Sequence, residues 1–186
     1  MLRTGTLQIV AIAVVGVMWT TAEASVLRSM SLAELANQAD DIVVAKVVSV
    51  AAAWDPTHRR ILSTIEADVE DTWKGDATTR HVTIVQPGGT VGDIEMTVYG
   101  MPTFSVAERA LLFLQRSAQR RVVVGMSEGK RPLRWNSVNN QWLVDGPDLT
   151  NAVEVAPNGR FRRTVVPPPL QLDTMHAQIR ALVDGK

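Results

Sequence analysis

The chain has 186 residues, of which 46% are hydrophobic, and it carries 19 basic and 19 acidic side chains but no cysteine. This composition is typical of a globular protein and excludes wholesale disorder, and the balanced charge gives no global field for nucleic acid or an anionic membrane. The lack of cysteine excludes disulfides, thiol catalysis, cysteine-based zinc sites and iron–sulfur clusters.

The first twenty-four residues have the layout of a secretory signal peptide. Arg3 precedes an apolar run over 7–19, and Ala22-Glu23-Ala24 forms an A-x-A cleavage site ahead of Ser25. The run is shorter than the roughly 20 residues of a spanning helix, so we expect cleavage rather than a retained membrane anchor. The sequence therefore predicts export to the periplasm or the extracellular space, with residues 25–186 as a single domain.

The first elements of this domain are a short helix and two long strands. Ser31 and Glu34 form a capping box that predicts a helix over about 32–39. Residues 42–54 are rich in β-branched side chains and apolar on both faces, which is typical of a central strand. Residues 60–74 alternate between apolar and polar positions, as in a half-buried antiparallel strand long enough to need strong coiling or a bulge.

The rest of the chain continues as short strands separated by turn signals. We expect a glycine-rich flexible loop at 87–92 and strands or buried runs at 81–86, 94–99, 110–114 and 121–126. Hairpins are expected about Asn139-Asn140 and about 157–159, and an amphipathic helix over 170–184. Seven to nine short strands with two flanking helices predict a mainly β barrel or sandwich.

Four motifs give the domain a resemblance to known proteins: Ala39–Val44, Trp73–Gly75, Gln86–Gly92 and Gly100–Arg109. Their order resembles that in a group of uncharacterised exported bacterial proteins, whose core distantly resembles the OB-fold of netrin-like and metalloproteinase-inhibitor domains. The resemblance implies an OB-like, partly open antiparallel β-barrel with its core at about 39–129, followed by extra hairpins at 130–166 and the C-terminal helix. Those inhibitors bind the catalytic zinc through an N-terminal cysteine, which this chain lacks, so their mechanism does not carry over.

The candidate chemistry is sparse. Residues 125–129 match the G-x-S-x-G pattern of serine hydrolases around Ser127, but Pro132 follows too soon for the helix that such a nucleophile turn requires. The three histidines, His58, His81 and His176, show no metal-ligand spacing. The acidic positions at 66, 68, 70 and 71 suit a solvated strand face, and the arginine pairs suit strand edges.

The sequence therefore predicts a non-catalytic binding or interaction domain without cofactor, metal or nucleic acid, whose partner is a protein or a cell-envelope component. Two alternatives are a protease-inhibitor or protease-associated domain and, less favoured, a hydrolase using Ser127. Trp54 and Trp73 are expected in the barrel core. The candidate binding surface combines a glycine-rich loop with a tryptophan hairpin: Gly88, Gly89, Thr90, Gly92, Trp135 and Trp142.

Overall fold

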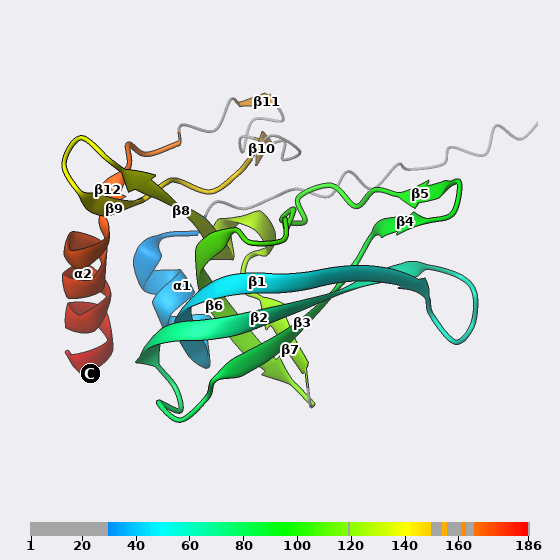
Figure 1. Ribbon diagram of the computed structural model, residues 1–186, viewed down its shortest axis with the longest axis horizontal. Coiled ribbons are helices and arrows are strands. Elements are labelled where there is room, and N and C mark those ends of the chain that lie inside the picture. Colours follow the sequence, from blue (N-terminus) through cyan, green and yellow to red (C-terminus); the bar gives the residue numbers. More distant parts are fainter. Residues whose placement is uncertain (1–29, 119, 150–153, 156–160, 163–165, 186) are drawn as a thin grey trace, which may run out of the picture.

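The computed structural model describes residues 30–118, 120–149, 154–155, 161–162 and 166–185. The protein is mainly β, with one large mixed sheet, a short helix ahead of it and a longer helix at the C-terminal end (Figure 1). The expected signal peptide at 1–24 and the expected turn at 157–159 lie outside the described residues.

The elements follow one another in the order that the sequence pattern indicates. In chain order they are α1 (Leu32–Gln38), β1 (Asp41–Trp54), β2 (Ile61–Lys74), β3 (His81–Pro87), β4 (Gly89–Val91), β5 (Ile94–Met96), β6 (Arg109–Ser117), β7 (Arg120–Val123), the 3₁₀ turn η1 (Met126–Gly129), β8 (Lys130–Asn136), β9 (Gln141–Val144), β10 (Glu154–Val155), β11 (Phe161–Arg162), β12 (Leu170–Gln171) and α2 (Leu172–Asp184).

Five strands of the large sheet form a partly closed ring. Their order is β1-β2-β3-β7-β6, and β6 pairs again with β1. The expected mainly β, partly open barrel is thus confirmed, but the sheet is mixed, because β3 and β7 run parallel and share one register pair, Ile84 with Arg121. The sheet continues beyond the ring through β8, β9 and β12, while β4 with β5 and β10 with β11 form separate two-stranded sheets.

Two hydrophobic cores lie on opposite faces of β1 and β6, which explains why both strands are apolar on both faces. The barrel core fills the ring and contains Val43, Ala45, Val47, Ile65, Ala67, Val82, Ile84, Ala110, Leu112 and Leu114. The helix-side core lies between the sheet and both helices and contains Leu35, Ala36, Ala39, Ile42, Val44, Leu111, Phe113, Val124, Val144, Met175 and Ile179.

The two longest strands, β1 and β2, are paired along almost their whole length with three register shifts, at Ile42/Val43, Val44/Ala45 and Val47/Ser49. A bulge bends its strand and increases the local twist, which lets a long ribbon curve around a barrel. The expected bulge is confirmed, and the shift beside Val48 also changes which side chains of β1 face the barrel interior.

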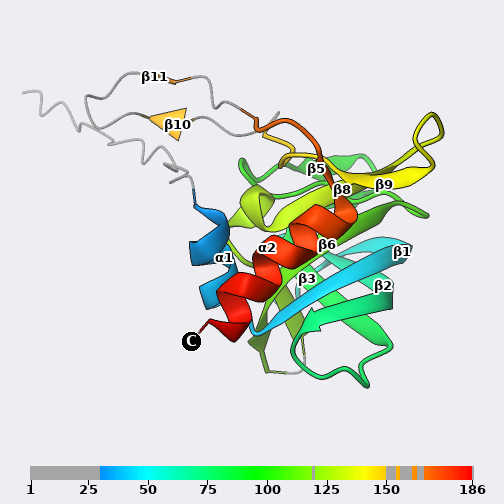
Figure 2. The same ribbon diagram turned by 90° about the vertical axis from the view of Figure 1, so that its left-hand side faces the viewer.

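Both helices cover the same side of the sheet (Figure 2). The capping box of α1 is formed as expected: the backbone N–H of Glu34 donates to Ser31 Oγ, and the Ser31 N–H donates to Glu34 Oε2. At the other end of α1, Lys74 Nζ donates to the carbonyl oxygens of Ala36 and Ala39. Among the described residues, no helix is both long and apolar enough to cross a membrane.

Candidate functional site

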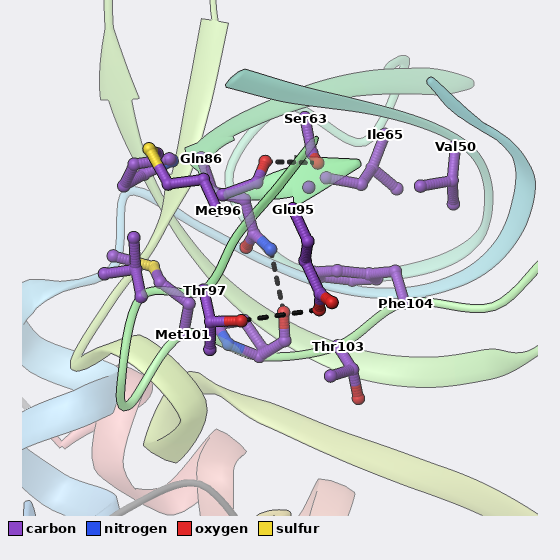
Figure 3. Close-up of a pocket in the computed structure, with 15 residues that line it drawn as sticks. Val50, Ser63, Ile65, Gln86, Glu95, Met96, Thr97, Met101, Thr103 and Phe104 are labelled. Atoms are coloured by element: carbon purple, nitrogen blue, oxygen red, sulfur yellow. Dashed lines mark hydrogen bonds between the residues drawn. The ribbon is translucent and has the colours of Figure 1, made fainter. Parts of the chain in front are cut away.

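A cleft opens at one end of the barrel, and it contains part of the predicted glycine-rich site (Figure 3). Its volume is about 250 Å³, and we call it the barrel-mouth cleft. The walls come from β1, β2, the end of β3, the β4–β5 hairpin and the segment that leads to β6: Val50, Ser63, Ile65, Gln86, Pro87, Gly88, Gly89, Glu95, Met96, Thr97, Val98, Met101, Pro102, Thr103 and Phe104.

The barrel core ends at this cleft. The bulge at Val48 shifts the side-chain alternation of β1, so that the even-numbered residues after it point into the barrel. After the bulge, Val50 and Ala52 pair with Ile65 and Ser63, whose side chains point into the barrel. Val50 remains 39% exposed although it lies on the inner side, whereas Ile65 is fully buried. The apolar interior of the barrel is therefore accessible from outside at this point.

Two glycines let the chain pass close over the start of β2 and the end of β1. Gly89 has φ +127°, and a Cβ there would lie 2.6 Å from Ser63 Oγ and 2.8 Å from Ala52 Cβ. Gly88 has φ +109°, and its carbonyl oxygen accepts a 2.7 Å hydrogen bond from Ser63 Oγ. Both positions require glycine, since other residues adopt this backbone conformation only with strain.

The cleft holds one polar atom without a partner. Gln86 Nε2 donates to the Pro102 carbonyl oxygen at 2.8 Å, but Gln86 Oε1 is buried and accepts no hydrogen bond. A buried acceptor left without a donor is costly, so a group that supplies an N–H or O–H would be stabilised there. Glu95 is the one charged residue among those that line the cleft, and its carboxylate lies 3.4 Å from Thr97 Oγ1.

The six predicted site residues do not form one surface. Gly88 and Gly89 line the cleft, whereas Thr90 and Gly92 are exposed on the hairpin and do not line it. The expected flexible loop at 87–92 is wrong in part: β4 and β5 pair through Val91 and Ile94, so Gly92 occupies a two-residue turn with φ +59°. A Gly-Asp dipeptide between short apolar runs is a recognised hairpin signal that the sequence reading missed.

The tryptophan hairpin lies toward the opposite end of the molecule from β4 and β5 (Figure 1). Trp135 and Trp142 are a cross-strand pair, as expected, with ring centroids 5.2 Å apart. Their planes meet at 64°, so the contact is edge-to-face and not the expected stack. Trp135 is 45% exposed, and the Arg109 guanidinium lies over the Trp142 ring at 5.2 Å.

The other two tryptophans of the domain are not in the barrel core. Trp73 is partly buried on the helix side, where it stacks on His176 of α2 with centroids 4.6 Å apart and its Nε1 donates to Asp71. Trp54 is partly buried at the end of β1 and faces the His58 ring at 6.2 Å. The expectation for both residues is wrong. Trp54 lies at the far end of β1, beyond the stretch that pairs with β6, whereas Trp73 is the residue skipped at the Ile42/Val43 register shift and packs on the helix side.

Ser127 does not have the surroundings of a catalytic nucleophile. It is 2% exposed in η1, a four-residue 3₁₀ turn that leads into β8 and not into the α-helix that a nucleophile turn requires. Its Oγ has no hydrogen-bond partner, so no general base lies within reach of it among the described residues.

His81 is held between two carboxylates on the outer face of β2 and β3. Its Nδ1 lies 3.0 Å from Asp68 Oδ1 and its Nε2 lies 2.6 Å from Glu66 Oε2, which also accepts from Thr83 Oγ1. These hydrogen bonds, first to Asp68 and then to Glu66, raise the pKa of His81. The described part of the chain contains no group of three or more residues placed to hold a metal ion.

Sequence reasoning missed most of the cleft because its walls come from separate segments. Gln86 precedes the two glycines, and Phe104 lies in the Gly100–Arg109 motif, so both residues were in recognised motifs without an assigned role. Met101 lies in the same motif as Phe104 and Met96 lies in the strand expected at 94–99, and neither had an assigned role. Only the folding of the segment before β6 over the end of β3 brings these side chains together.

No family model, curated protein or solved structure matches the chain. The fold and the cleft therefore define the molecule by themselves: a mainly β domain with a partly closed ring of strands and a small, mostly apolar cleft at one end of it.

Proposed function

We propose that this protein is an exported, non-catalytic binding domain that holds part of a partner protein or cell-envelope component in the barrel-mouth cleft. The observation that carries the proposal is the buried, unpartnered Gln86 Oε1 in a cleft with apolar walls. An apolar group next to an N–H donor, as in a peptide segment, would bury its surface there and satisfy that acceptor.

The barrel type belongs to the same proposal. We infer an OB-like barrel, and the support is a ring of five strands in the order β1-β2-β3-β7-β6 with one parallel pair. OB-folds bind their ligands on one face of the barrel and through the adjoining loops. The β4–β5 hairpin and the segment before β6 are connections of that kind, and both line the cleft.

Site-specific crosslinking tests the binding role. A photoreactive amino acid at Thr97, on the rim of the cleft, is compared with one at Thr78, an exposed position in the turn between β2 and β3. After irradiation in the exporting cell, we expect a discrete adduct from position 97 and none from position 78. Equal labelling from both positions, or none from either, would contradict the proposal.

A second pair of variants separates the cleft from the tryptophan hairpin. Met101→Lys places a charge in the cleft, and Trp135→Ala removes the exposed aromatic ring from the other end of the molecule. We expect the first substitution to abolish the adduct formed from Thr97 and the second to leave it unchanged. The reverse pattern would move the binding role to the hairpin.

The alternative role as a protease inhibitor rests on the barrel alone, and a fold does not specify a function. A screen against metalloproteases at micromolar protein tests it directly. The export step has its own test: N-terminal sequencing of protein recovered outside the cytoplasm is expected to start at Ser25.

A further inference from the structure

A second cavity lies on the helix side of the sheet and shares no residue with the barrel-mouth cleft. Its volume is about 400 Å³, within the usual range of small-molecule sites. We call it the helix-side cavity. It lies between the start of α1, the start of β8, the end of β9 and α2, and most of its wall is apolar: Met30, Leu32, Val144, Pro147, Leu149, Pro167, Pro168, Leu170 and Met175.

The cavity contains a buried guanidinium with an unused donor. The Arg131 side chain is only 10% exposed, and its Nη2 lies 3.5 Å from Glu128 Oε2, at the outer limit of a hydrogen bond. Arg131 Nε is buried and has no hydrogen-bond partner. A buried cation with a free N–H is costly, and an acceptor bound in the cavity would remove much of that cost.

The surrounding charges decide which acceptor fits. Glu128, whose side chain is 5% exposed, already places a negative charge beside Arg131. The other carboxylate that lines the cavity belongs to Asp145, which pairs with Arg134 at 3.3 Å. A ligand carboxylate would therefore leave an extra buried negative charge, whereas a neutral carbonyl oxygen would accept from Arg131 Nε without one.

We propose that the helix-side cavity binds a small apolar molecule with a neutral carbonyl group, of the amide or ester class, whose oxygen accepts a hydrogen bond from Arg131 Nε. The aliphatic part of the ligand lies against the methionine, leucine and proline side chains of the wall. This site is independent of the binding role proposed for the barrel-mouth cleft.

Calorimetric titration with three probes of equal chain length tests the charge preference: octanamide, octanoate and octylammonium. We expect the protein to bind octanamide at least about 10-fold more tightly than either charged probe, because octanoate would bury an extra negative charge and octylammonium has no acceptor for Arg131 Nε. Failure of octanamide to give saturable binding, or tighter binding of either charged probe, would overturn the proposal.

Two variants at the site and one control complete the test. Glu128→Gln leaves the charge of Arg131 unbalanced, so we expect the preference to change to octanoate. The double variant Glu128→Gln/Arg131→Met removes both charges together and is expected to weaken octanamide binding about 10-fold and to bind octanoate no better.

The control is Arg120→Met in β7, since Arg120 is exposed and does not line the cavity. We expect it to bind octanamide as the unmodified protein does. Unchanged octanamide affinity in the double variant would contradict the role of Arg131. Circular dichroism of each variant distinguishes loss of the site from loss of the fold.

Discussion

The two ends of the barrel are built differently. One end, which we call the clasped end, is closed by a charge cluster where β1 and β7 begin and β6 ends: Asp41 with Arg116 and Arg121. A second charge cluster, His81 with Glu66 and Asp68, lies on the outer face of β2 and β3. The other end carries the barrel-mouth cleft, where the apolar interior is accessible and Gln86 Oε1 is unpartnered. The contrast teaches that a buried carboxylate joins the strands at one end, while at the other end the apolar interior stays open.

The Asp41 cluster and the His81 cluster have opposite charge arrangements and different burial. Asp41 is a carboxylate with a 5% exposed side chain between two cations, at 2.6 Å from Arg116 Nη2 and 2.6 Å from Arg121 Nε. His81 is an exposed imidazole between two carboxylates. Burial strengthens electrostatic interactions and water screens them, so the Asp41 cluster should contribute more stability than the His81 cluster.

The largest effect is expected from Asp41→Asn at the clasped end. The substitution leaves two arginines without their shared carboxylate and should lower the free energy of unfolding by about 3 kcal/mol, as measured in urea. Crosslinking from Thr97 in the cleft is expected to persist at temperatures where the variant stays folded. A loss below about 0.5 kcal/mol would show that the Asp41 cluster does not stabilise the clasped end.

Acid tests the same cluster without a mutation. Burial raises the pKa of Asp41, but the hydrogen bonds and charges of Arg116 and Arg121 outweigh it and hold the pKa below its ordinary value of 3.8. A lowered pKa stabilises the fold above the ordinary value, and this contribution is lost as the pH falls through the folded-state pKa. The difference between the unmodified protein and Asp41→Asn should therefore be constant near neutral pH and shrink below about pH 4.

The next largest effect is expected at the mouth, from Gly89→Ala. Its Cβ would meet Ser63 Oγ and Ala52 Cβ in a strained backbone conformation, which should cost about 2 kcal/mol. Gly92→Ala is the matched control, because its φ is also positive but no atom lies within 4 Å of the added Cβ. Equal losses in thermal unfolding for both variants would show that backbone conformation alone, and not the close approach to β2, requires Gly89.

A smaller effect is expected from His81→Gln on the outer face of β2 and β3, where solvent screens the exposed cluster. We expect a loss of less than about 1 kcal/mol. Hydrogen bonds to Asp68 and Glu66 raise the pKa of His81 above its ordinary value of 6.5, so its contribution is complete below pH 6.5 and is lost as the pH rises through the folded-state value. The stability difference from the unmodified protein should be larger at pH 5.5 than at pH 9, and the opposite trend would contradict this account.

The smallest effect on stability is expected from Thr97→Ala on the rim of the cleft. The side chain is exposed and its one hydrogen bond, to Glu95, is long, so unfolding should change by less than about 0.5 kcal/mol. A larger loss would show that the rim belongs to the structural scaffold and would weaken the contrast between the two ends.

Much of the fold was predictable from the sequence because its signals are local. The capping box at Ser31 and Glu34, the alternation along β2, the continuous apolar run of β6 and the amphipathic pattern of α2 each depend on neighbours a few residues away. These patterns predicted the types of the elements and their order, and the tryptophan hairpin was found with its cross-strand pair correctly matched.

Only the tertiary structure decided which residues meet. The parallel contact between β3 and β7 joins strands far apart in the chain, and no local pattern encodes it. The same holds for Gln86 beside Pro102 and for Arg131 between the sheet and the two helices. Sequence determined the faces that must be buried, because burial follows side-chain periodicity. Both cavities, in contrast, arise where distant segments cross, and these crossings depend on how the whole chain packs.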